Sequence, residues 1–326
     1  MNLMVIGSGI MGRLQTTLFF PNEPSNADDP VLLSLPAPLR PRLVAHVDRA
    51  THRRARQRVR RQPASDRDDL VADFGVDGYR YHSTHANFVR DRRKDVLGDF
   101  DFRDTTKTGD PAKGIGPMMT DLTRLRAGHV GAQFWSVYVS ASLPEPQAVQ
   151  ATLEQIDTVK RLVARYPQQL QLCTSADEVE RAMRSGKVAS LIGMEGGGSI
   201  GSSLGVLRQM YALGARYMTL THFKNNAWAD SATDKPEHNG LTPFGKNVVR
   251  EMQRLGMLVD LSHVSEKTML DAMEVAGAPV IFSHSNASAL NGHTRNASDA
   301  ALDRLKANGG VIMVNFYPGY VLEAAR

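Results

Sequence analysis

From Asp121 onward, short apolar runs rich in β-forming residues alternate with amphipathic helical stretches. This alternation is typical of βα units that build a parallel sheet. The apolar runs predict strands over residues 130–139, 188–197, 216–222, 257–263, 279–285 and 310–317. Six such runs indicate the α/β class, either a barrel or an open doubly wound sheet.

Helices are predicted between these strands. Ser175 and Glu178 form a capping box at the start of one helix, and Gly186 suits its end. Further helices are expected over residues 244–255 and 267–275. A longer helix shows apolar residues at helical spacing on a single face, namely Val149, Leu153, Ile156, Val159 and Val163. Each helix follows a strand in the order that a right-handed βα barrel requires.

Four predicted strands end on a polar residue that is able to bind a metal or a substrate: Glu195, His222, His263 and His284. The carboxyl ends of parallel barrel strands meet at one face, so these side chains are expected to lie together. A carboxylate with two neutral imidazoles is a good ligand set for a divalent metal, and zinc is the first choice. Any one histidine alone is more simply explained as a satisfied buried residue, but their joint recurrence favours a site.

The period of two along a strand also predicts which side chains share a face. It places Val259, Leu261 and His263 on one face of their strand and Asp260 on the opposite face. Methionines such as Met210 are expected to fill the core.

Residues 1–70 have a different composition from the rest of the chain, and we expect a basic, Pro-rich tail there and a barrel domain over residues 71–326. Net charge is +5, and seven arginines fall between Arg49 and Arg61, so the basic excess is local. A solvated arm is favoured over a nucleic-acid contact because no aromatic residues interleave with these arginines. Gly7 to Gly12 matches a dinucleotide-binding fingerprint, but a Pro-rich segment follows where a helix is needed.

The single cysteine, Cys173, excludes an intramolecular disulfide and a Cys-rich zinc site. The first twenty residues lack the basic start of a secretory signal, and no apolar run reaches the ~18 residues of a membrane span. The sequence therefore predicts a cytoplasmic protein with no membrane span and no nucleic-acid partner.

The strings GAQFWSVYVS, IGMEGG, LTHFKNNAWAD, LVDLSHVS, APVIFSHSNA and MVNFY occur in this order. Together they resemble the membrane (renal-type) dipeptidase family of the amidohydrolase-like TIM barrels. The resemblance implies a two-zinc enzyme that hydrolyses the peptide bond of free dipeptides with a metal-activated water. It also implies that Glu195, His263 and His284 bind metal, that His222 binds substrate, and that Arg295 holds the substrate carboxylate.

The sequence departs from the family pattern at the first strand, at the end of the chain, and at Gly198, where many relatives have a histidine. The family has a His-x-Asp pair at its first strand, whereas Tyr79 to Tyr81 follow Asp77-Gly78 here, with His82 and His85 nearby. The family's eighth strand carries an Asp for proton transfer, and the chain stops at Arg326. We therefore expect an α/β fold of the (β/α)8 TIM-barrel type without its last βα unit, one zinc, low activity and no assigned acid–base residue.

Two other interpretations stay open. The chain is alternatively an inactive barrel remnant that binds zinc or a partner without turnover. In the second of these interpretations, the arm from Arg53 to Arg61 binds nucleic acid. A barrel without its final unit exposes the edges of two strands, and a homodimer would cover them.

Overall fold

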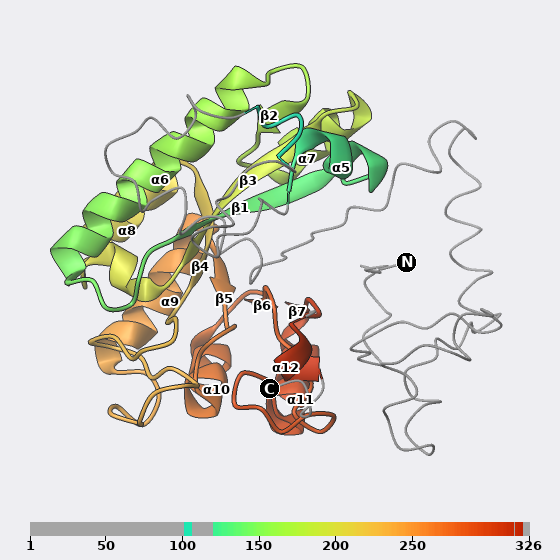
Figure 1. The fold of residues 1–326 in the computed structure, drawn as a ribbon. Coiled ribbons are helices and arrows are strands. Elements are labelled where there is room, and N and C mark those ends of the chain that lie inside the picture. The colour runs from blue at the N-terminus through green and yellow to red at the C-terminus, as the bar shows by residue number, and fades with distance from the viewer. Residues whose placement is uncertain (1–100, 106–119, 316, 322–326) are drawn as a thin grey trace, which may run out of the picture.

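A computed structural model describes residues 101–105, 120–315 and 317–321 (Figure 1). The predictions for residues 1–70, for the domain boundary at residue 71, and for His82 and His85 lie outside these ranges. None of the helices in the described ranges combines the length and the apolar composition that a membrane crossing requires.

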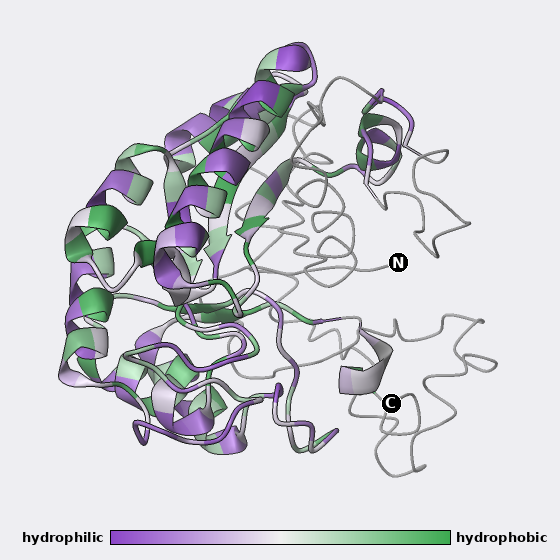
Figure 2. Cartoon of the chain, turned by 60° about the vertical axis from the view of Figure 1, so that its left-hand side comes forward, coloured by the Kyte–Doolittle hydropathy of each residue, from purple (hydrophilic) through white to green (hydrophobic). Residues whose placement is uncertain are grey.

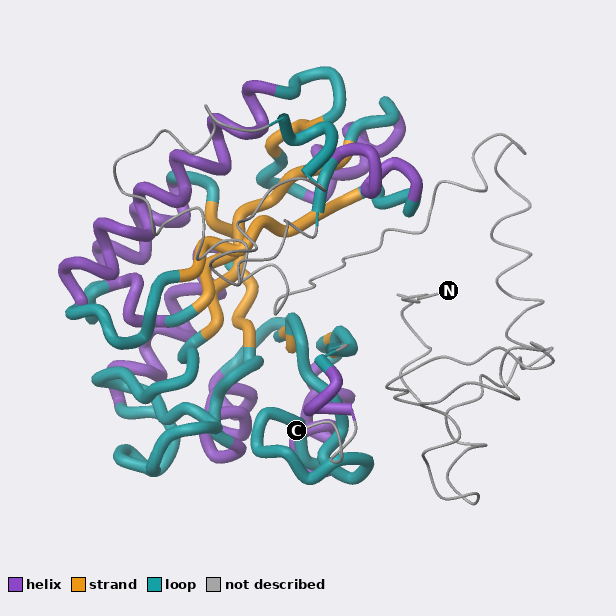
Figure 3. Tube along the Cα trace, in the orientation of Figure 1, coloured by secondary structure: helices purple, strands orange, loops and turns teal. Residues whose placement is uncertain are grey.

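The described strands form one parallel sheet that curls as part of a barrel (Figures 1 and 3). They are β1 (Ala132–Tyr138), β2 (Leu170–Leu172), β3 (Val188–Glu195), β4 (Ala215–Thr219), β5 (Leu258–Asp260), β6 (Ile281–Phe282) and β7 (Val311–Ile312). The order in the sheet is β1, β3, β4, β5, β6, β7, and β2 pairs with the start of β3. This sequential parallel order confirms a (β/α)-barrel type of fold.

Helices connect the strands and line the outer side of the curved sheet (Figure 3). They are α5 (Leu122–Ala127), α6 (Glu145–Arg165), α7 (Ala176–Arg184), the 3-10 helix η4 (Gly197–Ile200), α8 (Leu204–Ala212), α9 (Pro243–Leu255), α10 (Glu266–Val275), α11 (Asp299–Asn308) and α12 (Pro318–Val321). The helices carry a hydrophilic and a hydrophobic side (Figure 2), as helices that cover one face of a sheet do.

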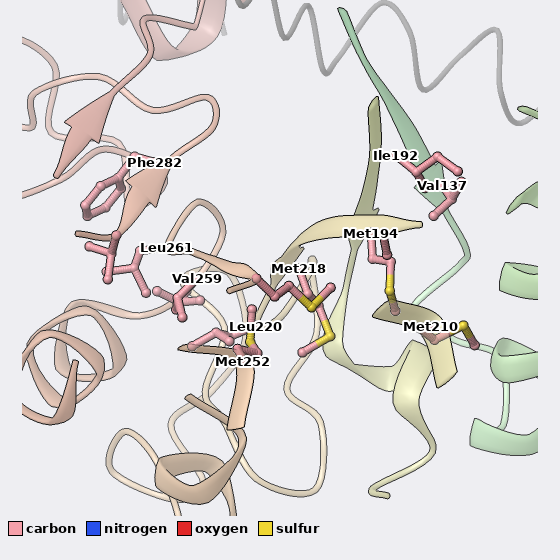
Figure 4. Close-up of a cluster of buried hydrophobic side chains, with 14 of the residues drawn as sticks. Val137, Ile192, Met194, Met210, Met218, Leu220, Met252, Val259, Leu261 and Phe282 are labelled. Atoms are coloured by element: carbon pink, nitrogen blue, oxygen red, sulfur yellow. The ribbon is translucent and has the colours of Figure 1, made fainter. Parts of the chain in front are cut away.

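The main core lies between the sheet and these helices. Side chains from successive strands and from α8 and α9 meet there (Figure 4), including Met194, Met218, Val259, Leu261, Phe282, Met210 and Met252. All of them are buried. The prediction that Met210 fills the core is confirmed.

The inner face of the sheet has a second, smaller cluster. It contains Phe134, Leu191, Tyr217 and Ile281, and Cys173 is buried with them. Side chains alternate between the two faces of each strand, so this cluster and the main core come from neighbouring positions. The strand residues of the inner cluster precede the carboxyl ends of their strands and pack on the inner face of the sheet.

One local prediction needs correction, and one strand was not foreseen. Leu153, expected on the buried face of its helix, is 40% exposed, whereas Ile156 and Val159 are buried. The buried stripe of α6 instead passes through the small residues Ala148 and Ala151. The strand β2 was not predicted at all, because three residues are too short to show a period.

Helix caps agree with the sequence. The Ser175 side chain accepts a hydrogen bond from the backbone N–H of Glu178 at the start of α7. The Glu178 carboxylate accepts from the backbone N–H of Thr174 and also interacts with the backbone N–H of Ser175, as the capping box predicts. Gly186 follows the end of this helix with φ +73°, a conformation that glycine adopts without strain.

Candidate metal and substrate site

The carboxyl ends of β3 to β6 bring four polar side chains to one edge of the sheet. Glu195 is the last residue of β3, and His222, His263 and His284 follow the ends of β4, β5 and β6 within three residues. Glu195 pairs with Thr219, the last residue of β4, so the strand ends are level. Each of the four side chains is at most 4% exposed.

Three of these side chains direct a ligand atom at a common point. Glu195 Oε1 lies 3.0 Å from His263 Nε2 and 3.3 Å from His284 Nε2. The two Nε2 atoms are 2.8 Å apart. Among the described residues, this is the group of histidine, cysteine and acidic side chains whose ligand atoms all lie within 4.8 Å of one another. One carboxylate oxygen and two imidazole nitrogens fit a divalent transition metal.

The electrostatic surroundings favour the form of His263 that binds metal. Burial, together with the charge of Arg295 and the neighbouring His222, holds the pKa of His263 well below its usual value, although Glu195 opposes the shift. The imidazole is therefore neutral at pH 7. A neutral ring offers a nitrogen lone pair, which a metal requires.

The backbone at His263 is left-handed, with φ +69°. Its carbonyl accepts hydrogen bonds from Ala232 N at 2.7 Å and from the hydroxyls of Thr221 and Ser231 at 3.3 Å. The Ser231 hydroxyl also lies 2.6 Å from the carbonyl oxygen of His222. The loop after β4 therefore holds the turn that carries His263.

Asp230 organises this loop. Its carboxylate accepts hydrogen bonds from the backbone N–H groups of Glu237, His238 and Gly240 at 3.0–3.1 Å. Burial alone would raise the pKa of Asp230, but the three N–H groups outweigh it and lower the pKa. The Asp230 carbonyl accepts a hydrogen bond from the backbone N–H of Ser265 at 2.9 Å. This bond connects the loop to the residues just beyond His263.

The left-handed turn explains why one prediction about faces was wrong. Val259 and Leu261 point to the helices, and Asp260 lies on the opposite, inner face as predicted. His263 does not follow Val259 and Leu261. The strand ends at Asp260, and the positive φ at His263 redirects its side chain to Glu195. Alternation holds only while the backbone stays extended.

Glu195 has a supporting hydrogen bond that the sequence analysis missed. The Ser136 hydroxyl in β1 donates to Glu195 Oε2 at 3.0 Å. Tyr217 in β4 hydrogen-bonds to Ser136, and burial together with the nearby Glu195 raises the pKa of Tyr217 well above its usual value. A serine three residues after Gln133, in a strand that is buried along nearly its whole length, was the available signal.

The predicted substrate residues flank the three ligand side chains. His222 Nε2 is 3.7 Å from Glu195 Oε1, and its ring contacts Tyr138 with centroids 4.5 Å apart. Arg295 is 1% exposed, and its Nη2 donates to the carbonyl of His284 at 3.4 Å. The Arg295 guanidinium lies over the ring of Tyr320, 5.4 Å from its centroid.

The family model of the membrane dipeptidases (Peptidase family M19) matches residues 90–326. The chain belongs to the membrane dipeptidase family. This confirms the resemblance seen in the sequence. Members of the M19 family are metallopeptidases, and the three converging ligand side chains agree with a metal-dependent family.

The chain is also similar in sequence to a known dipeptidase. The chain is 51% identical over 207 residues to Dipeptidase tcpJ of Claviceps purpurea (strain 20.1), covering 61% of this chain and 49% of that protein. The chain therefore spans about half the length of this relative.

Solved structures of similar proteins agree with the fold. The probable dipeptidase PvdM from Pseudomonas aeruginosa superposes with a TM-score of 0.58 at 29% identity, covering 63% of this chain and 55% of that one. The M19 metallopeptidase dipeptidase AC gives 0.60 at 26% identity, covering 68% and 67% of the two chains.

Proposed function

We propose that this chain is a zinc-dependent dipeptidase that hydrolyses the peptide bond of free dipeptides. The observation that carries the proposal is the convergence of Glu195 Oε1 with the Nε2 atoms of His263 and His284 within 3.3 Å. These residues would hold the ion. A zinc with an open coordination position supplies an activated water and polarises the scissile carbonyl.

The substrate would lie between Arg295 and His222. A guanidinium pairs with a carboxylate through two parallel hydrogen bonds, so Arg295 would bind the terminal carboxylate of a dipeptide. Because Arg295 contacts the His284 backbone, that carboxylate would sit next to the ligand cluster. His222 would stabilise the charge that develops on the carbonyl oxygen. Ser136 would hold Glu195 in place through its hydrogen bond.

We expect one zinc per chain, because the described residues bring together one group of three ligand side chains. Family members are expected to hold two ions, and a mononuclear site would give low activity. A second candidate function follows from the same observation: a barrel that binds zinc without turnover. The homodimer that would cover the exposed strand edges stays a prediction.

The test combines metal content with hydrolysis. The full chain is dialysed against trace zinc, its metal is measured by elemental analysis, and a panel of free dipeptides is assayed with and without a chelator. We expect hydrolysis that the chelator abolishes and zinc restores. Glu195→Gln should lose both zinc and hydrolysis, whereas Glu180→Gln, the same change at an exposed carboxylate, should retain both.

Each outcome decides between the candidates. Zinc bound without hydrolysis of any dipeptide would support the barrel that binds metal without turnover. Absence of bound zinc would refute both candidates. Two zincs per chain would show that residues outside the described ranges contribute a second site, and the expectation of a mononuclear site would be wrong.

A further inference from the structure

A buried chain of hydrogen bonds leads from Asp260 through Ser283 to His284. The Ser283 hydroxyl lies 2.5 Å from Asp260 Oδ2 on one side and 2.8 Å from His284 Nδ1 on the other. All three residues are at most 2% exposed. Neither Asp260 nor Ser283 was given a role by the sequence analysis.

The surroundings of Asp260 fix the direction of these hydrogen bonds. Its Oδ1 accepts from the backbone N–H groups of Ser262 at 3.1 Å and Ser283 at 2.8 Å. Its Oδ2 accepts from the hydroxyls of Thr219 and Ser283. An ionised carboxylate only accepts hydrogen bonds, and four donors surround this one. The other acceptor near Ser283 Oγ is the Ser262 hydroxyl at 3.4 Å, much farther away than Asp260 Oδ2 at 2.5 Å. The single hydroxyl proton of Ser283 is therefore directed at Asp260.

The direction of this hydrogen bond determines which ring nitrogen of His284 carries the proton. Because the Ser283 proton points to Asp260, the Ser283 oxygen can only accept a hydrogen bond from His284 Nδ1. In a neutral imidazole one nitrogen carries the proton and the other has the lone pair. His284 Nε2 is thus left with its lone pair, and it faces Glu195 Oε1 at 3.3 Å and His263 Nε2 at 2.8 Å.

We propose that Asp260 and Ser283 are positioning residues that preset His284 in the Nδ1–H tautomer before metal binds. The proposal deepens the proposed function, on whose metal site it rests. A ligand imidazole held in this way needs no loss or transfer of a ring proton when it binds the ion. Groups that orient a histidine ligand from behind raise its affinity for metal, typically by about 10–100-fold.

His263 provides an internal contrast. Its Nδ1 has no hydrogen-bond partner among the described residues. His263 Nε2 lies 3.0 Å from Glu195 Oε1 and 2.8 Å from the lone pair of His284 Nε2. Both of these atoms accept hydrogen bonds, so the metal-free chain favours the Nε2–H tautomer of His263, the reverse of the tautomer proposed for His284. We call the hydrogen bonds from Asp260 through Ser283 to His284 the relay. The relay acts on the imidazole of His284 and not on that of His263.

The first measurement reads the tautomer directly in the metal-free chain. Long-range ¹H–¹⁵N correlation spectra of histidine-labelled protein distinguish protonated from unprotonated ring nitrogens, and His284→Gln assigns the signals by difference. We expect His284 to show a protonated Nδ1. Asp260→Asn preserves the shape but presents amide protons to the Ser283 oxygen, so the hydroxyl turns to His284 and the tautomer should reverse. An unchanged tautomer in Asp260→Asn would overturn the proposal.

The second measurement is zinc affinity by competition with a chelator. We expect Ser283→Ala to weaken the apparent Kd by about ten-fold. The matched control is Thr219→Val, which also removes one hydroxyl from Asp260 Oδ2 but does not touch His284. Its Kd should change by less than about two-fold. Equal weakening in both variants would show that only general support of Asp260 matters, and would refute the relay.

The two proposals fail in different ways. If zinc binds and the tautomer is preset, but no dipeptide is hydrolysed, the dipeptidase proposal fails and the relay stands. If dipeptides are hydrolysed but His284 in the metal-free chain is protonated at Nε2, the relay fails and the dipeptidase proposal stands.

Discussion

Gly193 in β3 lies directly beneath a buried aromatic ring, and Gly193→Ala should be strongly destabilising. Gly193 pairs with Tyr217 across β3 and β4. A Cβ at Gly193 would lie 2.1 Å from Cε1, 2.2 Å from Cζ and 2.7 Å from Cδ1 of that ring. Tyr217 is 1% exposed, so its ring cannot swing into solvent to make room.

The magnitude follows from two opposing effects. Real Cβ contacts essentially never fall below 3.0 Å, so the ring or both strands must move by about an ångström. Overpacking of this kind costs about 1–3 kcal/mol, and the rigid sheet places the change near the upper end. Gly193 does not have a positive φ, so alanine would otherwise be favourable here by about 0.5–1 kcal/mol. The net loss in the free energy of unfolding should be about 2 kcal/mol.

The assay is a double-mutant cycle by urea unfolding. Tyr217→Val removes every ring atom that the new Cβ would meet and keeps a residue suited to a strand. In that background, Gly193→Ala should be neutral or stabilising, which gives a coupling energy of about 2–3 kcal/mol. Gly198→Ala is the control, because a Cβ at Gly198 would meet no atom within 4 Å. Additive effects, with a coupling below about 0.5 kcal/mol, would refute the argument.

Two further predictions concern carboxylates away from the ligand cluster. Arg254 and Arg208 lower the pKa of Glu251 to about 2, so the stability that this group contributes is present above its ordinary pKa near 4.5 and is lost as the pH falls toward 2. Glu251→Gln should cost about 0.5–1 kcal/mol at pH 7, since the pairs are partly exposed, and urea unfolding at pH 7, 5, 4 and 3 should show the difference shrink below pH 4.5. A difference that grows in acid would contradict this sign. Asp230→Asn places amide protons against the backbone N–H groups of its loop and should cost about 2 kcal/mol by urea unfolding. Asp303→Asn, at an exposed position, should change stability by less than about 0.5 kcal/mol, and an equal loss in both variants would contradict the role of Asp230.

The order of strands and helices could be predicted because each long apolar run has a clear period and clear ends. The ends of the strands could not be predicted in the same way. The run over residues 257–263 reads as one strand, but it is extended only over Leu258–Asp260. Local apolar character does not reveal where the backbone leaves the sheet to form a turn.

The ligand cluster was predictable because its three members recur at the same place in the βα unit. Their supporting groups were not. Ser136 and Ser283 act through partners on neighbouring strands, and the register between strands decides which side chains meet. Asp260 was placed on the correct face, yet nothing in the order of residues shows that Thr219 and Ser283 both direct hydroxyls at it.

The left-handed backbone of His263 sets backbone conformational energy and metal binding against each other at a single residue. An L-residue with a Cβ pays about 1 kcal/mol to adopt this conformation, and glycine pays almost none. Glycine at position 263 would relieve this strain, but it would discard a metal ligand and leave empty the space of a buried ring that packs against Phe223 and His284. Efforts to make a more robust form of this protein should hold position 263 fixed and seek stability elsewhere in the fold.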